Sequence, residues 1–263
     1  MVETRNDGPP CPECHILATG ASGALGREVT IRLARPGVRL SLWGRNMDRL
    51  EETAALCRAR GAEAEVHAID LRDTTAALAL LRACDDCHPF AEAYLVAGLG
   101  DTLPAGRIAE DPEQVIRLLE ANLVAPAAMA SFLAERMAAR GAGRIALIGT
   151  AAASHSLPFA ASYSGSKAGL ARYADALRLA VKSRGVTVTL VSPGFFAPSG
   201  PGAATPSRPG EIGADRVAER TIAAVASGAA ELVVPRRFLL LRWLDRLLPR
   251  PLRDRVLLSL RLP

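Results

Sequence analysis

The sequence predicts an α/β fold, a doubly wound parallel sheet of the Rossmann type in a single domain. Short apolar segments alternate with longer amphipathic segments from about residue 14 to residue 235. Such alternation favours a parallel sheet that helices cover on both faces. The chain has 263 residues, of which 49% are hydrophobic, and this suits one domain with a substantial core and excludes a disordered chain.

Each expected strand is a run of apolar and β-branched residues bounded by turn residues, and each expected helix carries apolar residues at helical spacing. The strands are expected at 15–19, 38–43, 65–69, 91–96, 144–149, 187–191 and 232–234. The helices are expected from 27 to 35 and at 74–83, 112–140, 162–184 and 213–227. Gly141 and Gly185 follow two of these helices, as helix-stop glycines do. A ligand is then expected beyond the carboxyl ends of the strands.

A glycine-rich turn follows the first strand and leads into a helix. Glycines let the backbone turn tightly and approach a pyrophosphate, and the helix N-terminus offers free N–H groups to phosphate oxygens. The turn therefore predicts a dinucleotide site. Its candidate cofactor-binding residues are Gly20, Ser22, Gly23, Leu25 and Gly26.

Tyr163 and Lys167 stand four apart, which places them on one face of the expected helix. A nearby ammonium favours the phenolate, and this would make the tyrosine a usable general acid and base. The hydroxyl of Thr150 could hold a substrate oxygen while the tyrosine moves the proton. The pattern predicts proton-transfer chemistry at this place.

Taken together, these residues resemble the short-chain dehydrogenase/reductase family, over roughly residues 14–235. The resemblance implies a catalytic set of Asn122, Thr150, Tyr163 and Lys167, with Asn122 steadying a water and Lys167 also holding the nicotinamide ribose. It implies further cofactor contacts, with Asp70 and Leu71 at the adenine, Ala97 and Gly98 at its ribose, and Pro193 and Gly194 at the nicotinamide. Leu95-Val96 replace a common Asn-Asn pair, and Thr150 replaces the usual serine.

The resemblance implies an oxidoreductase that interconverts a ketone and a secondary alcohol by hydride transfer. The alternative is a protein of the same fold that binds the cofactor as a regulator or scaffold and turns over weakly or not at all. The segment 195–209 is rich in glycine and proline and is expected to be a loop that recognises the substrate.

Cofactor choice depends on the end of the second strand. Gly44 stands where relatives that use NAD tend to have an acid, and Arg45 follows it. A guanidinium suits the 2′-phosphate of NADP(H), so NADP(H) is favoured over NAD(H). The other interpretation of Arg45 is an ordinary surface arginine.

Four cysteines form two Cys-x-x-Cys pairs, each followed by a histidine. The strands next to the pairs are expected to be neighbours, so four thiolates could hold a structural zinc ion tetrahedrally. Free reduced thiols are the alternative. The candidate ligands are Cys11, Cys14, Cys84 and Cys87.

The segment 235–263 contains eight arginines and two aspartates, a net charge of +6, whereas the whole chain carries +5 and the remainder therefore −1. Leucines alternate with the arginines, and residues 236–263 are expected to form a basic amphipathic helical extension of the domain at 1–235. The extension suits an anionic membrane surface or a second subunit in a homodimer or homotetramer. Nucleic acid is not expected, because no stacking platform accompanies the charge.

The first residues are polar and lack an apolar signal region, and no uninterrupted apolar run reaches the ~20 residues of a membrane span. The expected location is the cytoplasm, with the inner face of a membrane as a peripheral alternative.

Overall fold

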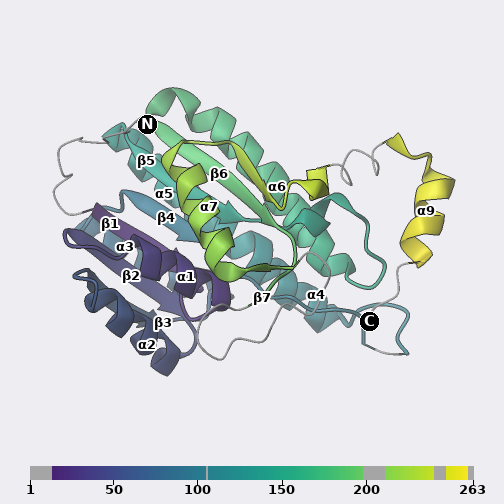
Figure 1. Ribbon diagram of the computed structural model, residues 1–263, viewed down its shortest axis with the longest axis horizontal. Coiled ribbons are helices and arrows are strands. Elements are labelled where there is room, and N and C mark those ends of the chain that lie inside the picture. The colour runs from purple at the N-terminus through teal and green to yellow at the C-terminus, as the bar shows by residue number, and fades with distance from the viewer. Residues whose placement is uncertain (1–13, 105, 198–210, 240–246, 260–263) are drawn as a thin grey trace, which may run out of the picture.

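The structure, a computed structural model, describes residues 14–104, 106–197, 211–239 and 247–259. Its strands are β1 (Cys14–Thr19), β2 (Val38–Gly44), β3 (Glu63–Ala68), β4 (Glu92–Leu95), β5 (Gly143–Ile148), β6 (Val186–Pro193), β7 (Phe196–Ala197), β8 (Ile212–Gly213) and β9 (Glu231–Val234). Seven of them form one parallel sheet in the order β3-β2-β1-β4-β5-β6-β9 (Figure 1). The order reverses between β1 and β4, which is the switch point where ligands bind in such sheets.

Helices cover both faces of the sheet, as the sequence predicts (Figure 1). One hydrophobic cluster joins β1 and β2 to α1 (Ala24–Leu33), α2 (Met47–Arg58) and α7 (Ala214–Ala226). The other joins the opposite face to α3 (Thr74–Cys87), α5 (Ala125–Arg140) and α6 (Ala161–Val181). Burial of these two apolar faces is the main source of stability for such a fold.

The expected helix at 112–140 is continuous but not uniform. It consists of α4 (Pro112–Leu119), a π-helical turn η1 (Glu120–Val124) and α5. Pro126 explains the change, because proline has no N–H to donate to the carbonyl of Asn122 four residues earlier. Among the described residues, this helix is the one long and apolar enough to cross a membrane. However, 39% of its most apolar 18-residue stretch is buried, and Leu118, Met129 and Leu133 lie in the core.

Several element boundaries differ from the prediction by one to four residues, and one helix was not predicted. The helix α2 was not assigned a range from the sequence, and it begins where the Asn46 side chain accepts a hydrogen bond from Arg49 N at 2.9 Å. The strand β3 begins two residues earlier than expected. The helix α3 extends to Cys87, so Cys84 and Cys87 lie in its last turn rather than in a connecting loop.

The cysteine geometry does not bring the expected zinc ligands together. Cys14 shares the face of β1 that carries Ile16, whereas Cys84 packs in the cluster on the opposite side of the sheet. Burial also raises the pKa of the Cys84 thiol to about 11, which opposes formation of the thiolate. Cys11 lies outside the described residues, within which no group of three or more His, Cys, Asp or Glu side chains is placed to hold a metal ion.

The C-terminal extension is described in part. Residues 237–239 are helical, residues 240–246 and 260–263 lie outside the described ranges, and α9 (Arg250–Ser259) lies within the extension. Figure 1 shows α9 at one end of the molecule, beyond α4 and β7.

Candidate active site

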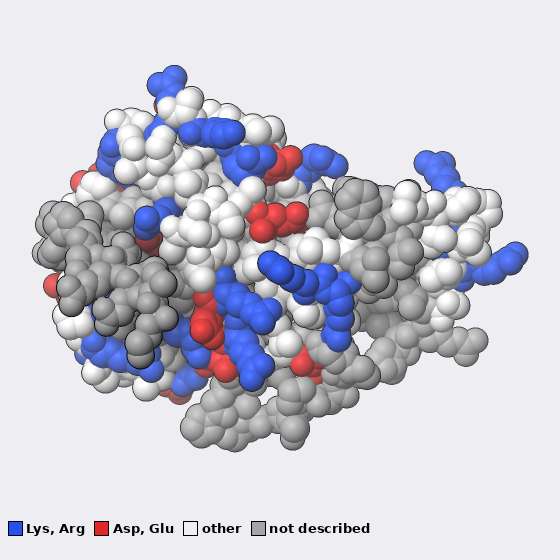
Figure 2. Space-filling view, turned by 45° about the horizontal axis from the view of Figure 1, so that its top comes forward, with Lys and Arg blue, Asp and Glu red and all other residues white. Residues whose placement is uncertain are grey.

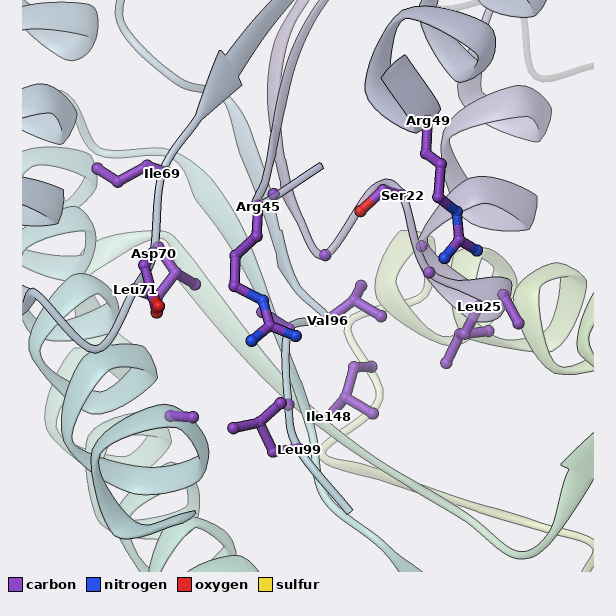
Figure 3. Close-up of a pocket in the computed structure, with 18 of the residues that line it drawn as sticks. Ser22, Leu25, Arg45, Arg49, Ile69, Asp70, Leu71, Val96, Leu99 and Ile148 are labelled. Carbon is purple, nitrogen blue, oxygen red and sulfur yellow. The ribbon is translucent and has the colours of Figure 1, made fainter. Parts of the chain in front are cut away.

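A pocket of about 460 Å³ lies at the carboxyl edge of the sheet, at the switch point between β1 and β4 (Figure 3). Most of the expected cofactor-binding residues line it. They are Gly20, Ser22, Gly23, Leu25, Gly26, Arg45, Asp70, Leu71, Ala97 and Gly98. The glycine turn, the ends of β2 and β3 and the segment after β4 therefore meet at one site, as the sequence predicts.

The glycine turn has a strict geometry. Gly20 has φ = +68°, a conformation that favours glycine, and a Cβ there would lie 2.9 Å from Ala97 Cα. A Cβ on Gly26 would overlap the carbonyl oxygen of Gly20. Helix α1 starts beside this turn with Gly23 as N-cap and no side-chain cap, so its first N–H groups remain available to an anion. The residues present fit a dinucleotide pyrophosphate.

Two guanidinium groups lie at the end of β2. Figure 3 shows the Arg45 side chain within the pocket and Arg49 near Ser22, and both arginines line the pocket. The sequence prediction included Arg45 but missed Arg49, which stands four residues later in the first turn of α2. Asn46 is a typical N-cap residue, and this signal could have predicted Arg49, because a basic side chain in the first turn of a helix lies where an anion binds.

Asp70 is held by an arginine that the sequence prediction also missed. The Arg72 guanidinium bonds both carboxylate oxygens of Asp70, with Nε to Oδ2 at 2.9 Å. The hydrogen bond from Arg72 lowers the pKa of Asp70, and the charge of Arg45 contributes a smaller effect of the same sign. Asp70 is therefore a fixed carboxylate at the pocket wall.

The expected catalytic residues Tyr163, Thr150 and Lys167 come from α6 and from the segment after β5. The Thr150 hydroxyl donates a hydrogen bond to the carbonyl oxygen of Pro193 at 3.4 Å. Burial raises the pKa of the Tyr163 hydroxyl, and a hydrogen bond with Thr150 opposes that rise. The tyrosine and the threonine are therefore hydrogen-bond partners.

Lys167 is buried, and its Nζ donates to the carbonyl oxygen of Ile148 at 2.8 Å. Burial lowers the pKa of Lys167 to about 8. The ammonium was expected to lower the pKa of Tyr163, but desolvation outweighs other influences on the tyrosine, and its pKa rises.

Asn122 lies in the π-helical turn and is fully buried. Its Oδ1 accepts from Leu99 N and its Nδ2 donates to Leu99 O, both at 2.8 Å. A Cβ on Gly98 would lie 3.0 Å from Asn122 Oδ1 and 3.1 Å from Lys167 Nζ. The amide thus holds the segment after β4 against Lys167, and π-helical turns occur often at functional sites.

The loop that follows β4 is also tied to the start of α6. Glu110 accepts a hydrogen bond from Ser162 N at 2.9 Å, and Leu103 N donates to Phe159 O at 2.7 Å. No sequence pattern predicted these contacts, because they join residues about fifty positions apart.

Pro193 ends β6, and Gly194 follows it, where a Cβ would overlap the ring of Phe238. Neither residue lines the pocket at the switch point. A second pocket, of about 430 Å³, contains Thr150, Arg172, Glu231 and Phe238. Most of the loop expected to recognise the substrate lies outside the described residues, but Phe196 lines the first pocket and Phe195 is exposed.

Comparison with known proteins agrees with this arrangement. A family model described as short chain dehydrogenase matches residues 14–205. An uncharacterized oxidoreductase of Myxococcus xanthus is 33% identical over 180 residues, which cover 68% of this chain and 70% of that protein. The chain spans between 57% and 70% of the length of the first three curated relatives it matches.

Two solved structures show the same fold. The bulky-bulky ketone specific alcohol dehydrogenase from Comamonas testosteroni has a TM-score of 0.76 at 20% identity, with 94% of each chain covered. A short-chain dehydrogenase from Sphingobium yanoikuyae in complex with NADPH also has a TM-score of 0.76, at 22% identity, with 94% of this chain and 96% of that chain covered. The sheet, the glycine turn and the family match lead to one conclusion: the chain belongs to the short-chain dehydrogenase/reductase family of oxidoreductases.

Proposed function

We propose that the protein is an NADP(H)-dependent oxidoreductase that interconverts a ketone and a secondary alcohol. The observation that carries the proposal is the pairing of Tyr163 with Thr150 at the carboxyl edge of the sheet that also forms the dinucleotide pocket. A proton donor and a second hydroxyl are the groups that a carbonyl oxygen needs while it becomes an alcohol.

In this reaction the Thr150 hydroxyl would turn from the carbonyl oxygen of Pro193 to donate to the substrate oxygen, and Tyr163 would give that oxygen a proton or remove it. The bound nicotinamide supplies or accepts the hydride. Lys167, with a pKa of about 8, is mostly charged at pH 7, and a positive charge one helical turn from Tyr163 would favour the tyrosinate. Asn122 holds the Leu99 backbone and keeps the cofactor-side wall in place.

The preference for NADP(H) is supported by Arg45 and Arg49, which both line the pocket next to the N-terminus of α2. A guanidinium binds a phosphate through charge-assisted hydrogen bonds. No acidic side chain stands at position 44 to repel the 2′-phosphate, because that residue is glycine. The NADPH complex of the Sphingobium yanoikuyae relative points in the same direction.

The test of cofactor choice is a titration with NADPH and with NADH, followed by nicotinamide fluorescence. Arg45→Ala and Arg49→Ala are each expected to weaken NADPH binding by roughly tenfold, about 1.4 kcal/mol, and to leave NADH binding nearly unchanged. Arg35→Ala is the matched control, because Arg35 is exposed and follows the C-terminal end of α1. Equal loss of both cofactors would contradict recognition of the 2′-phosphate.

The test of the reaction is a screen of ketones and secondary alcohols with Tyr163→Phe as the control. Activity that Tyr163→Phe abolishes while NADPH binding persists would support the proposal. Tight NADPH binding without turnover would instead favour the cofactor-binding regulator or scaffold. The raised pKa of Tyr163 is the observation that speaks for that second function.

A further inference from the structure

We propose that α9 docks on an anionic lipid membrane and holds the active-site end of the molecule against it. Twelve large hydrophobic side chains are exposed among the described residues, and four of them fall within residues 247–258. They are Leu247, Leu252, Val256 and Leu258, with exposed fractions of 74%, 47%, 47% and 72%. Such a concentration of exposed apolar side chains marks an interaction surface.

The helix has an inner and an outer side. Leu257 is buried, so the side that carries it faces the rest of the chain, whereas Leu252 and Val256, one turn apart, face outward. Its 10 residues give a length of about 15 Å. That length is half of the ~30 Å that a membrane span requires, so the helix fits a position in the plane of the membrane surface.

The charge selects the occupant of this surface. Arg255 lies on the outward side of α9 with Leu252 and Val256, whereas Arg250, Arg253 and the single acid Asp254 lie toward the side of Leu257. Residues 235–263 carry +6 while the rest of the chain carries −1, as the sequence shows. Two copies of the extension would repel each other, and the rest of a second copy offers little opposite charge. An anionic lipid surface complements both the arginines and the leucines.

The position of α9 determines which edge of the sheet would face the membrane. Figure 1 shows α9 at the right-hand end of the molecule, on the side where α4 lies, and α4 follows the carboxyl end of β4 in the chain. Figure 2 shows basic side chains beside uncharged surface at the projecting right-hand end. Docking would therefore turn the carboxyl edge of the sheet toward the lipid. On the basis of the proposed function, the substrate would be a ketone or alcohol with a lipid-like or acyl chain.

The test is co-sedimentation of the full chain with phosphatidylcholine vesicles, with and without phosphatidylserine. We expect at least ~10-fold stronger binding to the vesicles with phosphatidylserine, and we expect added salt to weaken it. Leu252→Glu combined with Leu258→Glu is expected to abolish binding. Leu179→Glu is the matched control, because this leucine is 58% exposed on α6, and it should bind like the wild type.

Wild-type protein that stays in the supernatant with both kinds of vesicle would overturn the proposal. So would a double variant that sediments like the wild type. A third overturning result is a wild-type dimer that does not bind vesicles and that the double variant converts to a monomer, because a second copy would then cover α9.

None of these measurements uses catalysis, so they stand whether or not the ketone reaction is found. Faster turnover of a vesicle-borne ketone than of the same ketone in detergent would support the substrate class.

Discussion

The carboxylate of Glu110 accepts a hydrogen bond from the backbone N–H of Ser162, with 2.9 Å between oxygen and nitrogen. Ser162 stands in the first turn of α6, one residue before Tyr163, and the N-cap residue Ala160 provides no side-chain hydrogen bond. A residue 52 positions away therefore supplies the missing cap. This contact fastens the loop after β4 to the helix that carries the proposed proton donor.

Replacing Glu110 should affect the helix start and the reaction together. Glu110→Ala leaves Ser162 N without its acceptor, so we expect a loss of about 1–2 kcal/mol in the free energy of unfolding. We also expect a lower kcat and a higher substrate KM, because the loop loses its anchor beside Tyr163, with NADPH affinity little changed. Urea unfolding and steady-state kinetics measure these effects.

Two further variants separate the hydrogen bond from other effects. Glu110→Gln keeps an acceptor oxygen and should restore most of the stability and of the kcat. Glu113→Ala removes an exposed acid in the first turn of α4 and should behave like the wild type. Equal losses in Glu110→Gln and Glu110→Ala would show that the charge, rather than the hydrogen bond, matters.

The buried lysine predicts a pH dependence of stability. The pKa of Lys167 is about 8 in the folded protein and near 10.5 in the unfolded chain, because burial disfavours the ammonium. The charged form therefore costs stability at pH values below 8. Between about pH 8 and pH 10.5 the lysine is neutral in the folded protein but still charged in the unfolded chain. The cost of burying the ammonium therefore disappears over this range, and the free energy of unfolding rises by about 3 kcal/mol in all.

The measurement compares wild type with Lys167→Met by urea unfolding at several pH values. The free energy of unfolding of the wild type should rise relative to that of the variant through this window. Lys182→Met is the matched control, since Lys182 is exposed just after α6, and its curve should run parallel to that of the wild type. Parallel curves for Lys167→Met would contradict the lowered pKa.

The glycine turn predicts that an alanine at position 26 and one at position 23 have very different effects. A Cβ at position 26 would overlap the backbone oxygen of Gly20, which cannot move away without opening the turn. Gly26→Ala should therefore cost about 3 kcal/mol or more of stability and abolish NADPH binding. At position 23 the Cβ would lie 3.2 Å from the same oxygen, and φ is −89°, so Gly23→Ala should cost less than ~1 kcal/mol. Thermal unfolding and NADPH titration of the two variants check the contrast.

Much of the fold and of the site follows from local sequence. Strand and helix alternation predicted the parallel sheet, because each apolar run is short and glycines follow two of the expected helices. The glycine turn, Thr150 and Tyr163 were predicted because their chemistry needs particular residue types at particular places. The structure confirms the parallel sheet and the pairing of β1 with β4, and it brings the glycine turn, Arg45 and Asp70 to one pocket.

What could not be predicted depends on contacts between distant segments. Glu110 gives no local signal for its bond to Ser162, and Arg49 is one of 30 arginines in a chain with 32 basic residues and two lysines. The zinc site was expected from the two Cys-x-x-Cys pairs and from the adjacency of the strands next to them. Strand order does not decide which face a side chain takes, and the alternation along β1 directs Cys14 away from Cys84.

The close approach of Ser22 to position 44 predicts how cofactor choice responds to an acid there. A Cβ on Gly44 would lie 2.9 Å from Ser22 Oγ and 3.3 Å from Leu50 Cδ2. In Gly44→Asp the carboxylate would repel the 2′-phosphate, and its Cβ would press on Ser22. We expect NADPH to bind at least ~10-fold more weakly without a matching gain for NADH.

In Gly44→Asp combined with Ser22→Ala the hydroxyl is gone, so the carboxylate can reach the ribose hydroxyls, and NADH should become the tighter ligand. Ser22→Ala alone is the control and should retain the preference for NADPH. Fluorescence titration of the three variants with both cofactors decides the matter, and a single variant Gly44→Asp that already prefers NADH would contradict the steric part of the argument.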